Sequence, residues 1–122
     1  IEARKREYPD AKVIVHPECR ASVIDLADAV LSTSGMVRYV RERDARTIIV
    51  GTELGMIHRL QKEAPEKCYV PATEQAICPQ MKLTELEDVI VALERLQYRV
   101  EIEEAVRSRA ERAVQRMIEI TA

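Results

Sequence analysis

Aromatic residues and glycines are scarce in this sequence of 122 residues. It contains no tryptophan and no phenylalanine, four tyrosines and only three glycines. A hydrophobic core must therefore come from Val, Ile, Leu, Met and Ala, which suits helices packed on a parallel β-sheet. The shortage of aromatic rings also argues against a surface that stacks nucleic-acid bases.

An excess of charge of one sign is also missing. The sequence has 19 Lys and Arg against 21 Asp and Glu, a net charge of -2. It therefore supplies no basic field for nucleic acid or for an anionic membrane. No apolar run approaches the ~20 residues that a bilayer span requires. We expect neither a nucleic acid nor a membrane as partner.

Cysteines are few and widely spaced. Cys19, Cys68 and Cys78 are an odd number, which fits neither a secreted disulfide framework nor a local zinc knuckle. This cysteine usage predicts a reducing cytoplasm. The sequence begins with Ile1 rather than Met, and its charged first residues contain no apolar signal-peptide core, so we expect a chain that is mature, processed or cut.

Short apolar runs alternate with helical patterns along the first two thirds of the chain. The runs predict strands at Lys12–Val15, Ala29–Leu31, Thr47–Val50 and Cys68–Val70. Helical spacing is found at about residues 19–28, from Ser32 to near Asp44, and from Thr52 to Pro65, with Thr52 placed to cap its helix. Helical crossovers between strands predict an α/β fold, a three-layer domain with a short parallel sheet flanked by helices.

The pattern changes after residue 83. Thr84 and Glu87 form a capping-box motif, and two long apolar stripes at helical spacing follow. The first stripe is Leu86, Val89, Ile90, Leu93 and Leu96, and the second is Ile102, Val106, Ala110, Ala113, Met117 and Ile120. We predict an α/β domain over residues 1–83 and two C-terminal helices over residues 84–122, which dock on this domain or on one that the chain lacks.

Polar residues follow three of the predicted strands. They are His16-Pro17-Glu18-Cys19, Ser32-Thr33-Ser34-Gly35 and Gly51-Thr52-Glu53. Ligands of an open parallel sheet bind outside the carboxyl ends of its strands. Hydroxyls and free backbone N–H groups at helix starts favour carboxylate or phosphate, so an anionic small molecule is the expected ligand.

Each of these residues also has a purely structural interpretation. A His at a strand end often only hydrogen-bonds a nearby carbonyl, and Ser or Thr at a helix start often only caps it. Cys19 and Cys68 suit small buried positions. Cys78 precedes Pro79 in a loop, a dipeptide that recurs at iron-sulfur ligands but is also common elsewhere. These alternatives remain open on the residues alone.

Four segments taken together resemble quinolinate synthase. They are His16-Pro17-Glu18-Cys19, Leu31-Ser32-Thr33-Ser34-Gly35-Met36, Ile49-Val50-Gly51-Thr52-Glu53-Leu54-Gly55 and Cys78-Pro79-Gln80-Met81-Lys82. The resemblance runs from about Tyr8 to beyond Lys82. It implies the third of three pseudo-symmetric domains, followed by the C-terminal helices, with the first two domains missing. The family often has Gly where this sequence has Leu31.

The resemblance implies an enzyme that condenses iminoaspartate with dihydroxyacetone phosphate to quinolinate, a precursor of NAD. It implies a 4Fe-4S cluster with one cysteine from each domain, and Cys78 matches the ligand of the third. His16 and Glu18 match a pair that faces the substrate and transfers protons, and Ser32 and Thr33 match residues that contact substrate carboxylate or phosphate. Cys19 matches a motif cysteine that is not expected to be a ligand. A lone copy of this chain should be inactive.

Two competing hypotheses remain. One is a non-catalytic α/β module that binds a small anion or a partner protein. The other is a zinc hydrolase using His16, Glu18 and Cys19, which lacks a further His or acid at ligand spacing. The sequence is also compatible with a homodimer.

Overall fold

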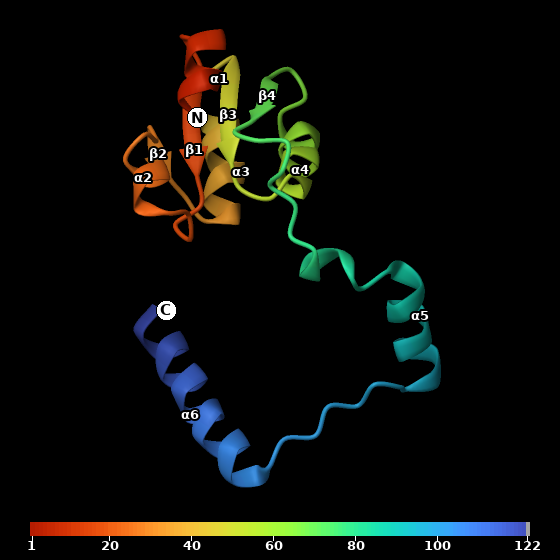
Figure 1. Cartoon of the computed structure of the whole chain (residues 1–122). Helices are drawn as coiled ribbons and strands as arrows, with labels where there is room; N and C mark the ends of the chain where they lie inside the picture. The colour runs from red at the N-terminus through yellow and green to blue at the C-terminus, as the bar shows by residue number, and fades with distance from the viewer. Residues whose placement is uncertain (122) are drawn as a thin grey trace. The chain divides into compact units, whose positions relative to one another are not determined.

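A computed structural model describes residues 1–121, which fall into two compact units, the first Ile1–Met81 and the second from Lys82 onwards. The first unit alternates helices and strands (Figure 1). In chain order these are α1 (Glu2–Glu7), β1 (Lys12–Val15), α2 (Ala21–Ile24), β2 (Ala29–Val30), α3 (Thr33–Glu42), β3 (Thr47–Gly51), α4 (Gly55–Glu63) and β4 (Cys68–Pro71). The predicted α/β class is confirmed.

The four strands form one sheet in the order β2-β1-β3-β4, and every neighbouring pair is parallel. β1 and β3 are adjacent in the middle of the sheet. The chain leaves β1 for α2 and leaves β3 for α4, two helices that pack on opposite faces. In sheets of this kind the connections diverge at such a pair and leave a crevice outside the carboxyl ends of the two strands.

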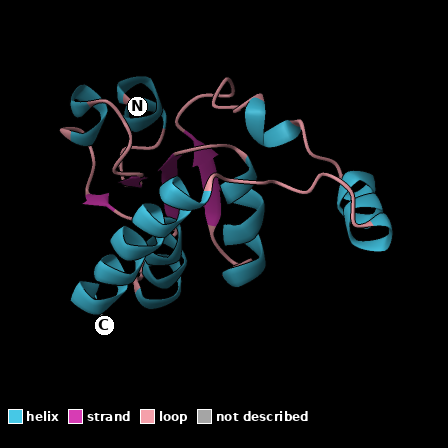
Figure 2. Ribbon diagram, turned by 90° about the horizontal axis from the view of Figure 1, so that it is seen from below, coloured by secondary structure: helices cyan, strands magenta, loops and turns pink. Residues whose placement is uncertain are grey.

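Helices lie on both faces of the sheet (Figure 2), and apolar side chains form one packed layer on each face. On one face, Ile14, Ile48 and Val50 pack with buried apolar residues of α3, of α4 and of the position directly after α4, which are Met36, Val40, Leu60 and Ala64. On the other face, Val13, Val15 and Ile49 pack with residues that flank α1 and with residues of α2, which are Ile1, Tyr8, Val23 and Ile24. Successive strand residues point to opposite faces, so a strand covered on both sides reads as a continuous apolar run, as β1 and β3 do.

The helix predicted at about residues 19–28 is wrong in length, because α2 is only Ala21–Ile24. The N–H groups of Leu26 and Ala27 bond carbonyls three residues back, which tightens the chain into turns. Asp28 is already part of the sheet, since its N–H donates to the Val13 carbonyl and its carboxylate accepts from the Val13 N–H at 2.8 Å. Four residues after α2 the chain must therefore be extended.

The prediction that Thr52 caps the next helix is also wrong. α4 begins at Gly55, and the Gly55 N–H donates to the Glu53 carboxylate at 2.7 Å. A carboxylate suits this position because the start of a helix carries a partial positive charge. Glu53, which the sequence pattern did not assign to a ligand, therefore has a structural role here.

The second unit is helical. A 3-10 turn (Gln80–Lys82) leads to it, and it contains α5 (Leu86–Arg95) and α6 (Glu104–Thr121). The cap of α5 lies at Glu85, whose N–H donates to Asp88 at 2.9 Å, one residue later than the predicted Thr84 and Glu87 motif. Ile102 precedes α6 and so does not belong to its helical stripe.

Many large apolar side chains of the second unit are exposed, among them Leu86, Leu93, Leu96 and Ile120. Within residues 1–121 no helix combines the length and apolar character needed to cross a bilayer.

Candidate functional site at the carboxyl edge of the sheet

His16 directly follows β1, at the edge where the connections that follow β1 and β3 diverge. Its N–H donates to the Gly51 carbonyl at the end of β3, over 3.1 Å. Its own carbonyl accepts from the Cys19 N–H at 3.0 Å, which closes a tight turn over Pro17 and Glu18. The His16 side chain is 23% exposed and that of Glu18 is 89% exposed. The turn thus presents a half-buried imidazole beside an open carboxylate.

The His16 ring contacts Glu18 in two ways through the same atom. Nδ1 lies 3.4 Å from the Glu18 backbone N–H and 3.7 Å from the Glu18 carboxylate. In the neutral ring, Nδ1 accepts from the N–H, so the ring proton is on Nε2. The turn therefore holds the imidazole and the carboxylate beside each other.

Ser32 and Thr33 lie after β2, at the start of α3. Ser32 is the N-cap, and its Oγ accepts from the Gly35 N–H at 3.2 Å. The hydroxyl therefore has the capping role that the sequence left open as its structural alternative. Capping uses only part of the acceptor capacity of a hydroxyl and leaves its proton available to an anionic ligand. The two functions are compatible.

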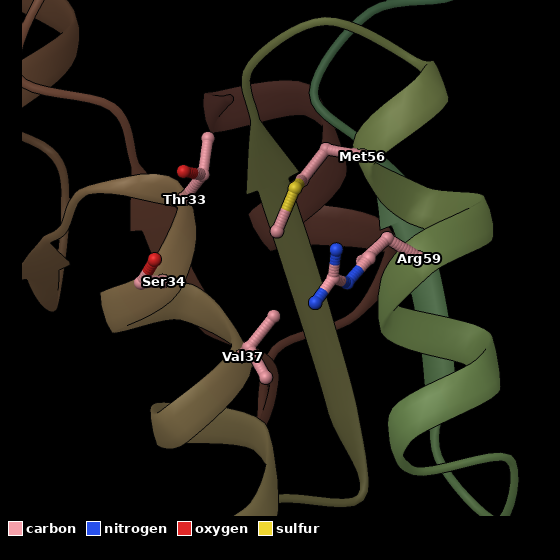
Figure 3. Close-up of a pocket in the computed structure, with 5 residues that line it drawn as sticks. All are labelled: Thr33, Ser34, Val37, Met56 and Arg59. Atoms are coloured by element: carbon pink, nitrogen blue, oxygen red, sulfur yellow. The ribbon is translucent and has the colours of Figure 1, made fainter.

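Thr33 lines a small pocket between α3 and α4 (Figure 3). Ser34 and Val37 come from α3, and Met56 and Arg59 come from α4. The Arg59 guanidinium extends from α4 toward α3, and its Nε also lies 3.4 Å from the Glu63 carboxylate. The sequence pattern did not single out Arg59. Its spacing of three from Met56, which puts both on one helix face, was the available signal.

Cys78 lies in the loop that follows β4. The loop is tied to the start of α4 by the Leu54 N–H, which donates to the Ala76 carbonyl at 2.9 Å. The Cys78 thiol is free and half-buried, 3.7 Å from the Gln80 side chain. Cys68 is at the other end of β4, at the amino edge of the sheet, and Cys19 bonds the Gly51 carbonyl.

The cysteines fit the expected cluster in one respect. A 4Fe-4S cluster is held by thiolates, and Cys78 is a thiol outside any disulfide, in the loop that follows the carboxyl end of β4. Over the part of the chain that the structure describes, no three His, Cys, Asp or Glu side chains are grouped to hold a metal ion. The zinc hydrolase hypothesis gains no support.

The structure thus places the candidate residues along one edge in three groups: His16 with Glu18, Ser32 with Thr33, and Cys78. Comparison with known proteins identifies the family. The sequence model of the family described as "Quinolinate synthetase A protein" matches residues 1–119. The chain belongs to the quinolinate synthase family.

Individual relatives agree with this assignment. The chain is 50% identical over 114 residues to the quinolinate synthase of Thermodesulfovibrio yellowstonii, covering 93% of the chain and 38% of that protein. It is 49% identical over 117 residues to the enzyme of a Dehalococcoides mccartyi strain, covering 96% of the chain and 39% of the relative. The quinolinate synthase of Methanosarcina barkeri is 47% identical over 116 residues, 95% of the chain and 38% of its own length. The chain therefore spans less than two fifths of these relatives.

Proposed function

We propose that this chain forms part of a quinolinate synthase that condenses iminoaspartate with dihydroxyacetone phosphate to quinolinate, releasing phosphate and water, in cytoplasmic NAD biosynthesis. The observation that carries the proposal is the edge described above, where the connections that follow β1 and β3 diverge and the His16 turn is bonded to Gly51. The reaction proposed for this edge follows from the membership of the chain in the quinolinate synthase family.

His16 and Glu18 are proposed to move protons during ring formation, which requires deprotonation next to a carbonyl or imine. Support comes from the shared Nδ1 atom, which contacts both the backbone N–H and the carboxylate of Glu18. The open carboxylate of Glu18 can accept a proton from the substrate side, and the adjacent ring can hold or return it.

Ser32 and Thr33 are proposed to bind the carboxylates or the phosphate of the substrates. They begin α3, a helix of ten residues whose first N–H groups favour an anion. The Ser32 hydroxyl, fixed by Gly35 as acceptor, has its proton free to donate to such a group.

Cys78 is proposed to be one of three cysteine ligands of a 4Fe-4S cluster, with the other two from two further domains. Three thiolates leave one iron open, and such an iron can act as a Lewis acid toward substrate oxygens. The same two domains are proposed to cover the site. The apolar faces of α5 and α6 are proposed to dock on one of them or on the α/β domain of this chain, and the whole protein could form a homodimer. The isolated chain is then inactive.

The test is iron and sulfide content of the full-length protein, expressed and purified without oxygen. We expect four irons per chain in the wild type, nearly none in Cys78→Ser, and four in the control Cys68→Ser, because Cys68 lies at the opposite edge of the sheet. Quinolinate formation from the two substrates should likewise be found in the wild type and in Cys68→Ser and be nearly absent in Cys78→Ser. A wild-type protein that makes no quinolinate, or a cluster that survives in Cys78→Ser, would contradict the proposal and leave an anion-binding or partner-binding module.

A further inference from the structure

Cys19 is the residue of the His16 turn to which the proposed function gives no role. Its thiol is half-buried and its Sγ lies 3.2 Å from the Gly51 carbonyl oxygen. That oxygen also accepts the His16 N–H at 3.1 Å. One carbonyl, at the end of the neighbouring strand, thus holds both ends of the turn.

The three bonds form a closed arrangement that we name the Gly51 clip: His16 N–H to Gly51, Cys19 Sγ–H to Gly51, and Cys19 N–H to the His16 carbonyl. Pro17 and Glu18 lie between the two held residues, and Pro17 has its φ fixed by its ring. The Glu18 N–H reaches back to His16 Nδ1. The position of the Glu18 carboxylate relative to the ring therefore depends on where Cys19 is held.

From this geometry we infer that Cys19 is a positioning residue for His16 and Glu18, acting through its hydrogen bond to the Gly51 carbonyl. The inference rests on the proposed function of that pair in proton transfer. The thiol of Cys19 bonds a backbone carbonyl and not the ring or the carboxylate, and the proposed cluster does not use it. Its thiol hydrogen fixes the second end of the turn.

A purely structural role for Cys19 makes a different prediction. The side chain also packs against the apolar layer formed by Val13, Val15 and Ile49. If packing were its whole contribution, an apolar residue of similar size would replace it better than a polar one. If the hydrogen bond positions the pair, a hydroxyl would replace it better, because serine also donates.

The experiment compares Cys19→Val and Cys19→Ser in the full-length protein, with thermal stability measured beside kcat and KM. We expect Cys19→Val to melt at or above the temperature of Cys19→Ser, yet to have a kcat about 5–10-fold below wild type with KM changed less than about 2-fold. Cys19→Ser should keep kcat within about 2-fold of wild type. If Cys19→Val keeps full activity, or if activity follows the melting temperature, the inference is wrong.

A second measurement does not need activity. Ring NMR resonances of His16, assigned by their loss in His16→Gln, should move in Cys19→Val and stay near wild type in Cys19→Ser, while those of exposed His58 on α4 stay unchanged in both. A wild-type protein that makes no quinolinate would overturn the proposed function, and the resonances would still decide whether the clip holds His16. Unmoved His16 resonances in Cys19→Val would overturn the clip alone.

Discussion

Gly51 is the residue whose replacement tests the geometry of the site most sharply. A Cβ added at this position would lie 2.7 Å from Cγ1 of Val15 and 3.3 Å from its Cβ. Val15 is fully buried, and Gly51 itself has no positive φ, so the limit is space and not backbone conformation. Gly51→Ala should therefore force the carboxyl ends of β1 and β3 apart.

The expected change in the free energy of unfolding of Gly51→Ala is the sum of two opposed effects. In an extended strand without a neighbour, replacing Gly by Ala stabilises by roughly 0.5–1 kcal/mol, because glycine loses more chain entropy on folding. Overpacking a tight core costs about 1–3 kcal/mol. At 2.7 Å the contact is too short for an ordinary carbon pair, so overpacking wins and the free energy of unfolding should fall.

A double-mutant cycle identifies the cause. Val15→Ala alone should cost about 2 kcal/mol for the buried methyl groups that it removes. The double variant lacks the Val15 Cγ1 atom that would clash with the new Cβ. Its loss in free energy of unfolding should therefore be smaller than the sum of the two single losses by about 1 kcal/mol or more. The assay is urea unfolding of the 122-residue chain followed by circular dichroism.

The control is Gly55→Ala in the exposed first turn of α4, which should be neutral or stabilising by up to about 1 kcal/mol. Additive losses in the cycle, or a Gly51→Ala chain as stable as wild type, would show that β1 and β3 are not as close as the structure has them.

Three further predictions concern single side chains. Ser32→Ala should lower the free energy of unfolding by about 1 kcal/mol in the same urea assay, since the Gly35 N–H loses its cap, and Ser32→Asp should restore it. Glu18→Gln in the full-length protein should keep its iron and lower turnover by about 10²-fold or more, and unchanged turnover would remove Glu18 from the mechanism. Burial alone would raise the pKa of Asp28, but hydrogen bonds from Val13 and Lys12 lower it overall. Because a lowered folded-state pKa adds stability only where the unfolded carboxyl is ionised, Asp28→Asn should be less stable than wild type near pH 7, and the difference should shrink as the pH falls below about 4.

The strands could be predicted from the sequence because both faces of the sheet are covered. β1 and β3 are buried on both sides, so they appear as continuous apolar runs that no surface helix would show. The length of α2 could not be predicted. Its apolar stripe continues to Ala27, but Asp28 is held at the sheet by hydrogen bonds to Val13. Val13 lies fifteen residues earlier in the chain, so a local pattern does not show this pairing.

Helix caps were harder to predict than helices. Thr52 and Glu53 both suit a helix start, and the sequence does not show that α4 begins two residues later, at Gly55. At α5 the same ambiguity shifted the cap by one residue, from Thr84 to Glu85. Neighbouring polar residues compete for one position, and tertiary packing decides which of them wins.

In the candidate site, some residues can be predicted from their side chains, and others matter only through backbone groups that folding brings together. His16 and Glu18 could be recognised because side chains carry their chemistry. The Gly51 carbonyl could not, because every residue has a carbonyl and only the pairing of β1 with β3 brings this one to the His16 turn. Glycine is required at that place for the same reason: a strand close enough to hold the turn by its backbone leaves no room for a side chain against Val15. The tight packing of the core and the position of the candidate pair are thus two results of one contact between strands.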